Sequence, residues 1–124
     1  MIKVLWISAG AVVGALGRYF ISGAVQSVAS GGFPLGTLAV NLCGSFLAGF
    51  FWGVSEGAVI PVNIRLFFFI GVFGSFTTFS TFSLENFHLL RDSEYFLFTI
   101  NTVVSLLAGV ICVFAGYFLS RVLY

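Results

Sequence analysis

Charge is the scarcest property of this sequence. Only 7% of its 124 residues are charged, whereas an average soluble domain carries about 25%, so the folded chain lacks the charged groups to cover a surface facing water. The five Lys and Arg residues are spread singly and leave a net charge of +1, which excludes the basic patch of a nucleic-acid-binding protein. With 60% hydrophobic residues and a mean hydropathy of +1.14, the composition predicts a membrane protein.

Residues that carry catalytic or metal chemistry are equally scarce. The two cysteines, Cys43 and Cys112, lie far apart without a CxxC partner, and His88 is the only histidine. The apolar segments contain no pair of acids, no Ser–His or Cys–His couple, and no phosphate-binding loop in a suitable context. We therefore predict that the protein is not an enzyme.

Four apolar segments are each long enough to cross a bilayer as a helix, which takes about 20 residues. They cover residues 4–25, 35–54, 62–87 and 95–121. The connections between them are too short to hold a soluble domain. The predicted fold is an all-α membrane protein, with residues 1–124 forming a single four-helix transmembrane domain.

The few cations show no preference for one side of the membrane. Lys3, Arg65 and Arg121 fall on one side of the predicted topology, and Arg91 and Arg18 on the other. Because an excess of Lys and Arg sets orientation, a chain without one can insert both ways up, which favours antiparallel pairing of two copies.

Small residues recur at intervals of four, a spacing that lets membrane helices pack closely. The sets are Gly10–Gly14, Gly49–Gly53, Ser105–Gly109 and Ala108–Cys112–Gly116. Each set can serve contacts within one subunit or between two. Together with the small size and the balanced charge, they favour a dual-topology homodimer.

The third segment contains an unusual stretch, "GSFTTFSTFSLEN", over residues 74–86. Its six hydroxyl side chains go nearly all round a helix at 100° per residue, so they cannot share one face. A break of the helix in mid-membrane, near residues 74–78, would turn carbonyl oxygens outward, an arrangement that can hold a dehydrated cation. The alternative is an intact helix whose hydroxyls bond back to its own carbonyls, and the residues alone leave both open.

Polar residues inside membrane segments are costly and are therefore functional candidates. Phe79 and Phe82 lie three residues apart among the hydroxyls, and the positive edges of their rings could solvate an anion, although most phenylalanines in membrane helices face lipid or pack. Arg18 either snorkels to the interface or lies near a polar pathway. The remaining candidates are Asn41, Glu85, Asn86, Asn101, Thr102 and Ser105.

Three motifs together resemble the Fluc (CrcB-type) fluoride channels: "GAVVGALGRY", "GTLAVNLCGSFLAG" and "GVFGSFTTFSTF". The resemblance covers all four segments. It implies an antiparallel, dual-topology homodimer with two pores, which lets fluoride leave the cytoplasm passively across the bacterial inner membrane. The implied partners are a second copy of the chain, fluoride and the lipid bilayer.

The resemblance also implies roles for individual residues. A central sodium ion, structural and not transported, would be held by backbone carbonyls of Gly74 and Thr77 from both subunits. Arg18 would lie at the pore entrance, and Glu85 matches an acid that follows the pore aromatics. The implied pore residues are Asn41, Phe79, Ser80, Thr81, Phe82 and Ser105.

The fourth segment departs from the family pattern, in which a tyrosine can be followed by serines at intervals of four. The corresponding residues here are Asn101, Ser105 and Gly109. Asn101 can still donate hydrogen bonds, whereas Gly109 has no hydroxyl to offer. That end of the polar track is therefore the part of the resemblance with least support.

Two other functions fit four short helices. A proton-coupled exporter of the small multidrug resistance type shares the architecture, but such exporters need a membrane-embedded carboxylate, usually in the first helix. The first segment here holds Arg18 and no acid, and Glu85 in the third is a weak substitute. A non-transporting assembly subunit is the second alternative, and it predicts no ion flux from the purified protein.

Overall fold

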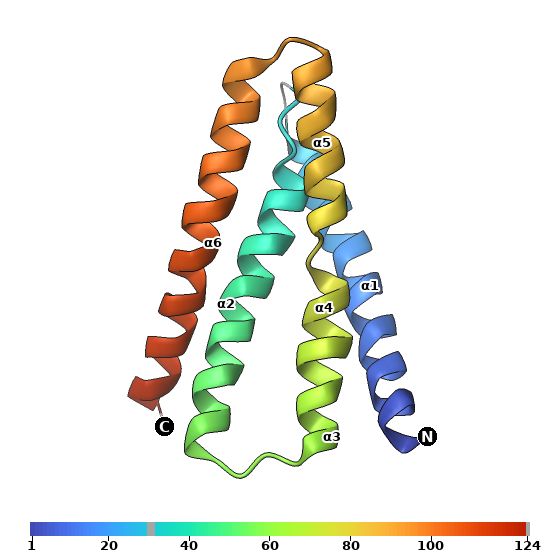
Figure 1. Ribbon diagram of the computed structural model, residues 1–124, viewed down its shortest axis with the longest axis vertical. Coiled ribbons are helices and arrows are strands. Elements are labelled where there is room, and N and C mark those ends of the chain that lie inside the picture. Colours follow the sequence, from blue (N-terminus) through green and yellow to red (C-terminus); the bar gives the residue numbers. More distant parts are fainter. Residues whose placement is uncertain (30–31, 124) are drawn as a thin grey trace.

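The computed structural model describes residues 1–29 and 32–123, and it consists of helices joined by short connections (Figure 1). The first two spans are α1 (Ile2–Val28) and α2 (Leu35–Gly57), and the last is α6 (Tyr95–Leu123). The third span is built from α3 (Val62–Arg65), the π-helical η1 (Leu66–Phe73), α4 (Gly74–Phe76) and α5 (Phe79–Arg91). All four stretches are long and apolar enough to cross a membrane, so the prediction of an all-α protein with four spans is confirmed.

The ends of the helices fall on the two sides that the sequence predicts. The N-terminus, the α2–α3 connection and the end of α6 lie at one end of the molecule, and the end of α1, the start of α2 and the α5–α6 connection lie at the other (Figure 1). Each helical stretch contains its predicted range and extends beyond it by a few residues. The extension has a simple cause, since helices continue past the hydrocarbon core into the interface, where hydropathy no longer marks them.

Glycines let the spans approach closely within the single chain. A Cβ placed on Gly71 of η1 would lie 2.8 Å from the Cα of Gly10 in α1, and one placed on Gly49 of α2 would overlap the carbonyl of Val113 in α6. Gly14, Gly53 and Gly116 make similar contacts. The Gly10–Gly14 and Gly49–Gly53 pairs and Gly116 therefore serve packing inside one subunit, whereas Gly109 has no such close neighbour.

The third span is interrupted in its middle. Thr77 (φ −83°, ψ 158°) and Thr78 (φ −150°, ψ 120°) are both extended, between the end of α4 and the start of α5. The intact-helix alternative is therefore wrong. The π-helical winding of η1, which precedes the interruption, was not anticipated from the sequence.

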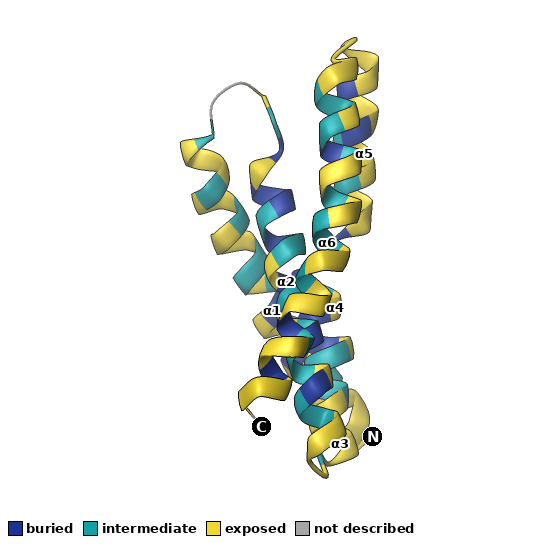
Figure 2. Cartoon of the chain, turned by 90° about the vertical axis from the view of Figure 1, so that its left-hand side faces the viewer, coloured by how far each residue is buried: buried dark blue, intermediate teal, exposed yellow. Residues whose placement is uncertain are grey.

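Only a thin core is buried in the single chain. Figure 2 shows buried residues as scattered patches where the helices meet, with exposed residues along much of their length. The buried apolar side chains are Leu38, Val40, Phe73, Phe76 and Leu89. Most exposed side chains of α1 and α6 are apolar, as expected for helices that face lipid or another protein.

Candidate functional site: an interrupted span beside two cavities

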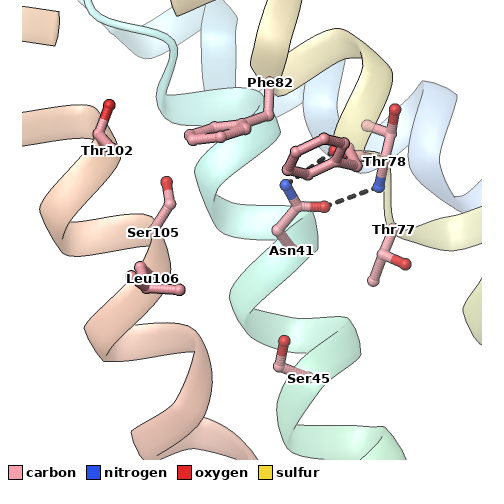
Figure 3. Close-up of a pocket in the computed structure, with 9 residues that line it drawn as sticks. Asn41, Ser45, Thr77, Thr78, Phe82, Thr102, Ser105 and Leu106 are labelled. Atoms are coloured by element: carbon pink, nitrogen blue, oxygen red, sulfur yellow. Dashed lines mark hydrogen bonds between the residues drawn. The ribbon is translucent and has the colours of Figure 1, made fainter.

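The interruption is held open by one side chain of α2. Asn41 Nδ2 donates to the Thr78 carbonyl (3.1 Å), and the Thr78 amide donates to Asn41 Oδ1 (2.8 Å) (Figure 3). In a continuous helix the Thr78 amide would instead bond to the carbonyl of Gly74, four residues earlier. Because unpaired backbone groups are costly inside a membrane, Asn41 makes the interruption stable by satisfying both polar groups of Thr78.

Thr78 also starts the helix that follows. Its Oγ1 accepts from the Thr81 amide (3.2 Å) and lies within hydrogen-bond distance of the Thr81 (3.0 Å) and Ser80 (3.2 Å) hydroxyls. This is an N-cap, a position where Thr is favoured because its oxygen satisfies an amide at the helix start. Sequence analysis missed the role of Thr78, although a Thr at the head of "TFSTF" is a usable N-cap signal.

A cavity of about 350 Å³ lies beside the interruption. It brings together four of the residues proposed for a pore, namely Asn41, Phe79, Phe82 and Ser105. The centroids of the two phenyl rings are 5.8 Å apart, and their planes are tilted by 40°. The other lining residues, all labelled in Figure 3, are Ser45, Thr77, Thr78, Thr102 and Leu106. Amide, hydroxyl and aromatic groups therefore converge here.

A second cavity, of about 390 Å³, contains two more of the predicted residues. Arg18 and Thr81 line it, together with Thr37 and Thr78. Thr78 thus lines both cavities, while Ser80 lines neither and makes its contact with the Thr78 hydroxyl. The structure therefore places most of the predicted pore residues in two cavities that share Thr78, at the interruption, as a lining residue.

Glu85 is tied to α2. The hydroxyl of the buried Thr37 donates a hydrogen bond to Glu85 Oε1 at 2.5 Å. This bond joins the start of α2 to α5. The other carboxyl oxygen, Oε2, is buried and has no hydrogen-bond partner within the described part of the chain. Glu85 therefore contributes to the attachment of α5, a role that the sequence did not indicate.

Among the polar residues of α6, Asn101 bonds to another helix, whereas Thr102 and Ser105 line the first cavity. Asn101 is only 1% exposed, and its Nδ2 donates to Asn86 Oδ1 of α5 (2.9 Å). Ser105 donates to Asn101 Oδ1 over a longer distance, 3.4 Å. Asn101 does not line the first cavity, whereas Ser105 and Thr102 do. Asn101 accordingly joins α6 to α5 instead of facing the polar space.

Comparison with known proteins gives consistent matches over nearly the whole chain. The family described as "CrcB-like protein, Camphor Resistance (CrcB)" matches residues 5–117. The Fluoride-specific ion channel FluC of Parabacteroides distasonis is 40% identical, covering 98% of this chain and 94% of the relative. The protein of the same name from Citrifermentans bemidjiense is 42% identical over 99% and 100% of the two chains. The one from Thermococcus onnurineus is 42% identical over 93% of each.

Proposed function

The chain belongs to the family of CrcB-like proteins, and on this premise we propose that it is a passive, fluoride-selective channel through which fluoride leaves the cytoplasm. The membrane concerned would be the bacterial inner membrane. The observation that carries the proposal is the cavity beside the interrupted third span, where Asn41, Phe79 and Phe82 meet. The chain is a membrane protein with four spans, and its relatives are named as channels and not as enzymes.

Fluoride is small and strongly hydrated, so a selective pathway has to replace its water with other donors. Asn41 Nδ2 carries two hydrogens and donates to the Thr78 carbonyl, which leaves one for an anion. The positive edges of the Phe79 and Phe82 rings and the hydroxyl of Ser105 supply further favourable contacts. The residues that line this cavity include no Lys or Arg, so binding stays weak enough for release, as conduction requires.

Arg18 stands away from these groups, in the second cavity with Thr37 and Thr81. A guanidinium at this place would attract fluoride toward the pathway without holding it at the narrow aromatic part. We therefore assign Arg18 to the entrance and Thr81 to the hydroxyls that fluoride meets after it. Snorkelling toward the interface is the alternative role for Arg18.

The functional unit that we propose is an antiparallel homodimer with two pores. Ser80 and Thr81 are exposed on the single chain, and Phe79 is 79% exposed, although all three lie in the middle of a membrane span. Polar side chains at this depth are expected to face protein or a water-filled path and not lipid. A second copy would cover this face and complete the walls of the pathway.

Antiparallel pairing requires that the chain insert in both orientations. A reporter fused to the C-terminus and active on only one side of the membrane is therefore expected to give signal on both sides, in comparable amounts. Adding two lysines beside Lys3 should shift the signal to one side, because Lys and Arg in short loops set orientation. A signal confined to one side in the unmodified chain would contradict the dual topology.

The interruption also offers oxygen atoms to a cation. The Thr78 amide bonds to Asn41, so the Gly74 carbonyl is released from its usual helical donor, and Thr77 lies between α4 and α5. We propose that these two carbonyls, with those of the second copy, hold a structural sodium ion that is not transported. A donor set made only of carbonyl oxygens suits a dehydrated alkali cation. When bound, the ion would add fixed positive charge between the subunits.

Fluoride efflux from liposomes that contain only this protein tests the proposal. With potassium and valinomycin present to remove the electrical barrier, a fluoride electrode should record rapid release, and chloride-loaded vesicles should release nothing. Empty liposomes are the control. No release from a well-folded protein would favour an assembly subunit. Release that needs a proton gradient and does not depend on valinomycin would favour a coupled exporter.

A further inference from the structure

The four Ser and Thr side chains of α6 differ in whether their hydroxyls have a partner. Three of them do: Thr99 bonds to the Tyr95 carbonyl (2.9 Å), Ser120 to the Tyr117 carbonyl (2.7 Å) and Ser105 to Asn101 Oδ1 (3.4 Å). The fourth, Thr102 Oγ1, is buried and has no partner among the described residues. Back-bonding to a carbonyl in the preceding turn is the usual choice for Thr in a helix, so Thr102 is an exception.

A buried hydroxyl without a partner is destabilising, and native proteins contain few of them. The other buried side-chain oxygen without a partner in the described part of the chain, Glu85 Oε2, belongs to a carboxyl group, which is chiefly an acceptor. Thr102 differs because a hydroxyl can donate, and because its residue lines the cavity beside the interruption. Thr side chains in helices populate two χ1 rotamers, so rotation about a single bond can turn the hydroxyl toward that space.

Ser105, the neighbouring hydroxyl in the same cavity, is less free to donate. Its oxygen lies 3.4 Å from Asn101 Oδ1, a long hydrogen bond, and Asn101 is itself bonded to Asn86. Figure 3 shows Thr102 and Ser105 following one another along α6 on one side of the Phe82 ring, with Asn41 on the other side in this view. A donor from α6 and the remaining hydrogen of Asn41 Nδ2 therefore border the same space from different helices.

We propose that the Thr102 hydroxyl donates a hydrogen bond to fluoride in the pathway, and that it is the main hydroxyl donor from α6, ahead of Ser105. This inference rests on the proposed channel function. It explains why an otherwise costly unpartnered hydroxyl lies at a cavity that Asn41 and Ser105 also line: the anion, or the water that accompanies it, supplies the acceptor. Asn86 and Asn101 then contribute indirectly, because Asn86 holds Asn101 in place and Asn101 accepts the hydrogen bond of Ser105.

The test compares variants in the valinomycin-dependent fluoride efflux assay. Thr102→Val keeps the shape of the side chain and removes the hydroxyl, and it should slow efflux about tenfold or more, as expected for the loss of one hydrogen bond to a charged group. Thr102→Ser keeps the hydroxyl and should conduct nearly as well as the parent. Ser105→Ala should slow efflux less than Thr102→Val does.

Thr99→Val is the matched control, since it makes the same change one turn earlier on α6, at an exposed residue outside the cavity. It should leave efflux unchanged. Size-exclusion elution and thermal unfolding establish that each variant is folded, and Thr102→Ala replaces Thr102→Val if the latter is not. A conducting parent with an equally fast Thr102→Val, or a larger loss in Ser105→Ala, overturns this inference alone. A parent that does not conduct overturns the channel proposal instead.

Discussion

Replacing Asn41 by Leu should reduce fluoride efflux by about a hundredfold or more. The change removes both hydrogen bonds to Thr78 and leaves two backbone groups without partners, at a cost of about 1–3 kcal/mol for each group. The Thr78 amide can then recover a partner by bonding to the Gly74 carbonyl. This bond would make the helix continuous, and the Gly74 carbonyl would no longer be available to the proposed sodium ion. The liposome assay measures the loss, and hydrogen exchange of the peptide covering residues 74–81 reports the change in the backbone.

Asn63→Leu is a suitable control for this variant. Asn63 lies in α3 at the start of the third span and lines neither of the two cavities. Asn41→Asp separates the two bonds, because it keeps an acceptor for the Thr78 amide but loses the donor to the Thr78 carbonyl. It should also conduct poorly, since a carboxylate in the cavity repels an anion. Efflux at the parent rate in Asn41→Leu would rule out the proposed role of this amide.

Phe79→Ile and Phe82→Ile should each lower fluoride efflux by about a hundredfold while the protein stays folded. Isoleucine is apolar and fits a membrane helix, but it has no ring edge with positive character. Fluoride would lose one of the few groups that replace its water in a selective pore. The two rings lie 5.8 Å apart in the first cavity, so we expect that neither can substitute for the other. Electrode-recorded efflux and size-exclusion elution together measure the effect.

Phe87→Ile provides the comparison on the same helix. Phe87 is 57% exposed and does not line the cavity, so its replacement should leave efflux unchanged. If Phe79→Ile and Phe82→Ile both conduct at the parent rate, the ring edges have no part in conduction, and the two residues are ordinary membrane-facing aromatics.

The sequence determined where the four spans lie, because the bilayer imposes simple requirements on a spanning helix. A spanning helix must be apolar over about 20 residues, so hydropathy was sufficient to locate all four, and the short connections required alternating directions. The same argument identified Asn41 and the hydroxyls of the third span as functional candidates, since polar groups inside the membrane are energetically costly unless they are paired. The motif resemblance identified the family from residues that are local in the sequence.

Only the tertiary structure decided how these residues are used. The sequence left open whether the third span is intact or interrupted. The answer depended on Asn41, which is 37 positions away from Thr78 in the sequence. Backbone groups freed by a break need a partner from another helix, and Asn41 provides it. The glycine pairs fit contacts within or between chains equally well, and the structure uses Gly10 and Gly49 within the chain.

The difference in role between Asn101, Thr102 and Ser105 was also invisible in the sequence. All three are polar residues of one helix, and their spacing does not reveal which has a partner. The bond from Asn101 to Asn86 of α5, and the absence of such a bond for Thr102, follow from where α5 lies after the interruption. Sequence thus determined which groups enter the membrane, since that depends on each helix alone, whereas packing between helices decided which of those groups stay free to meet an ion.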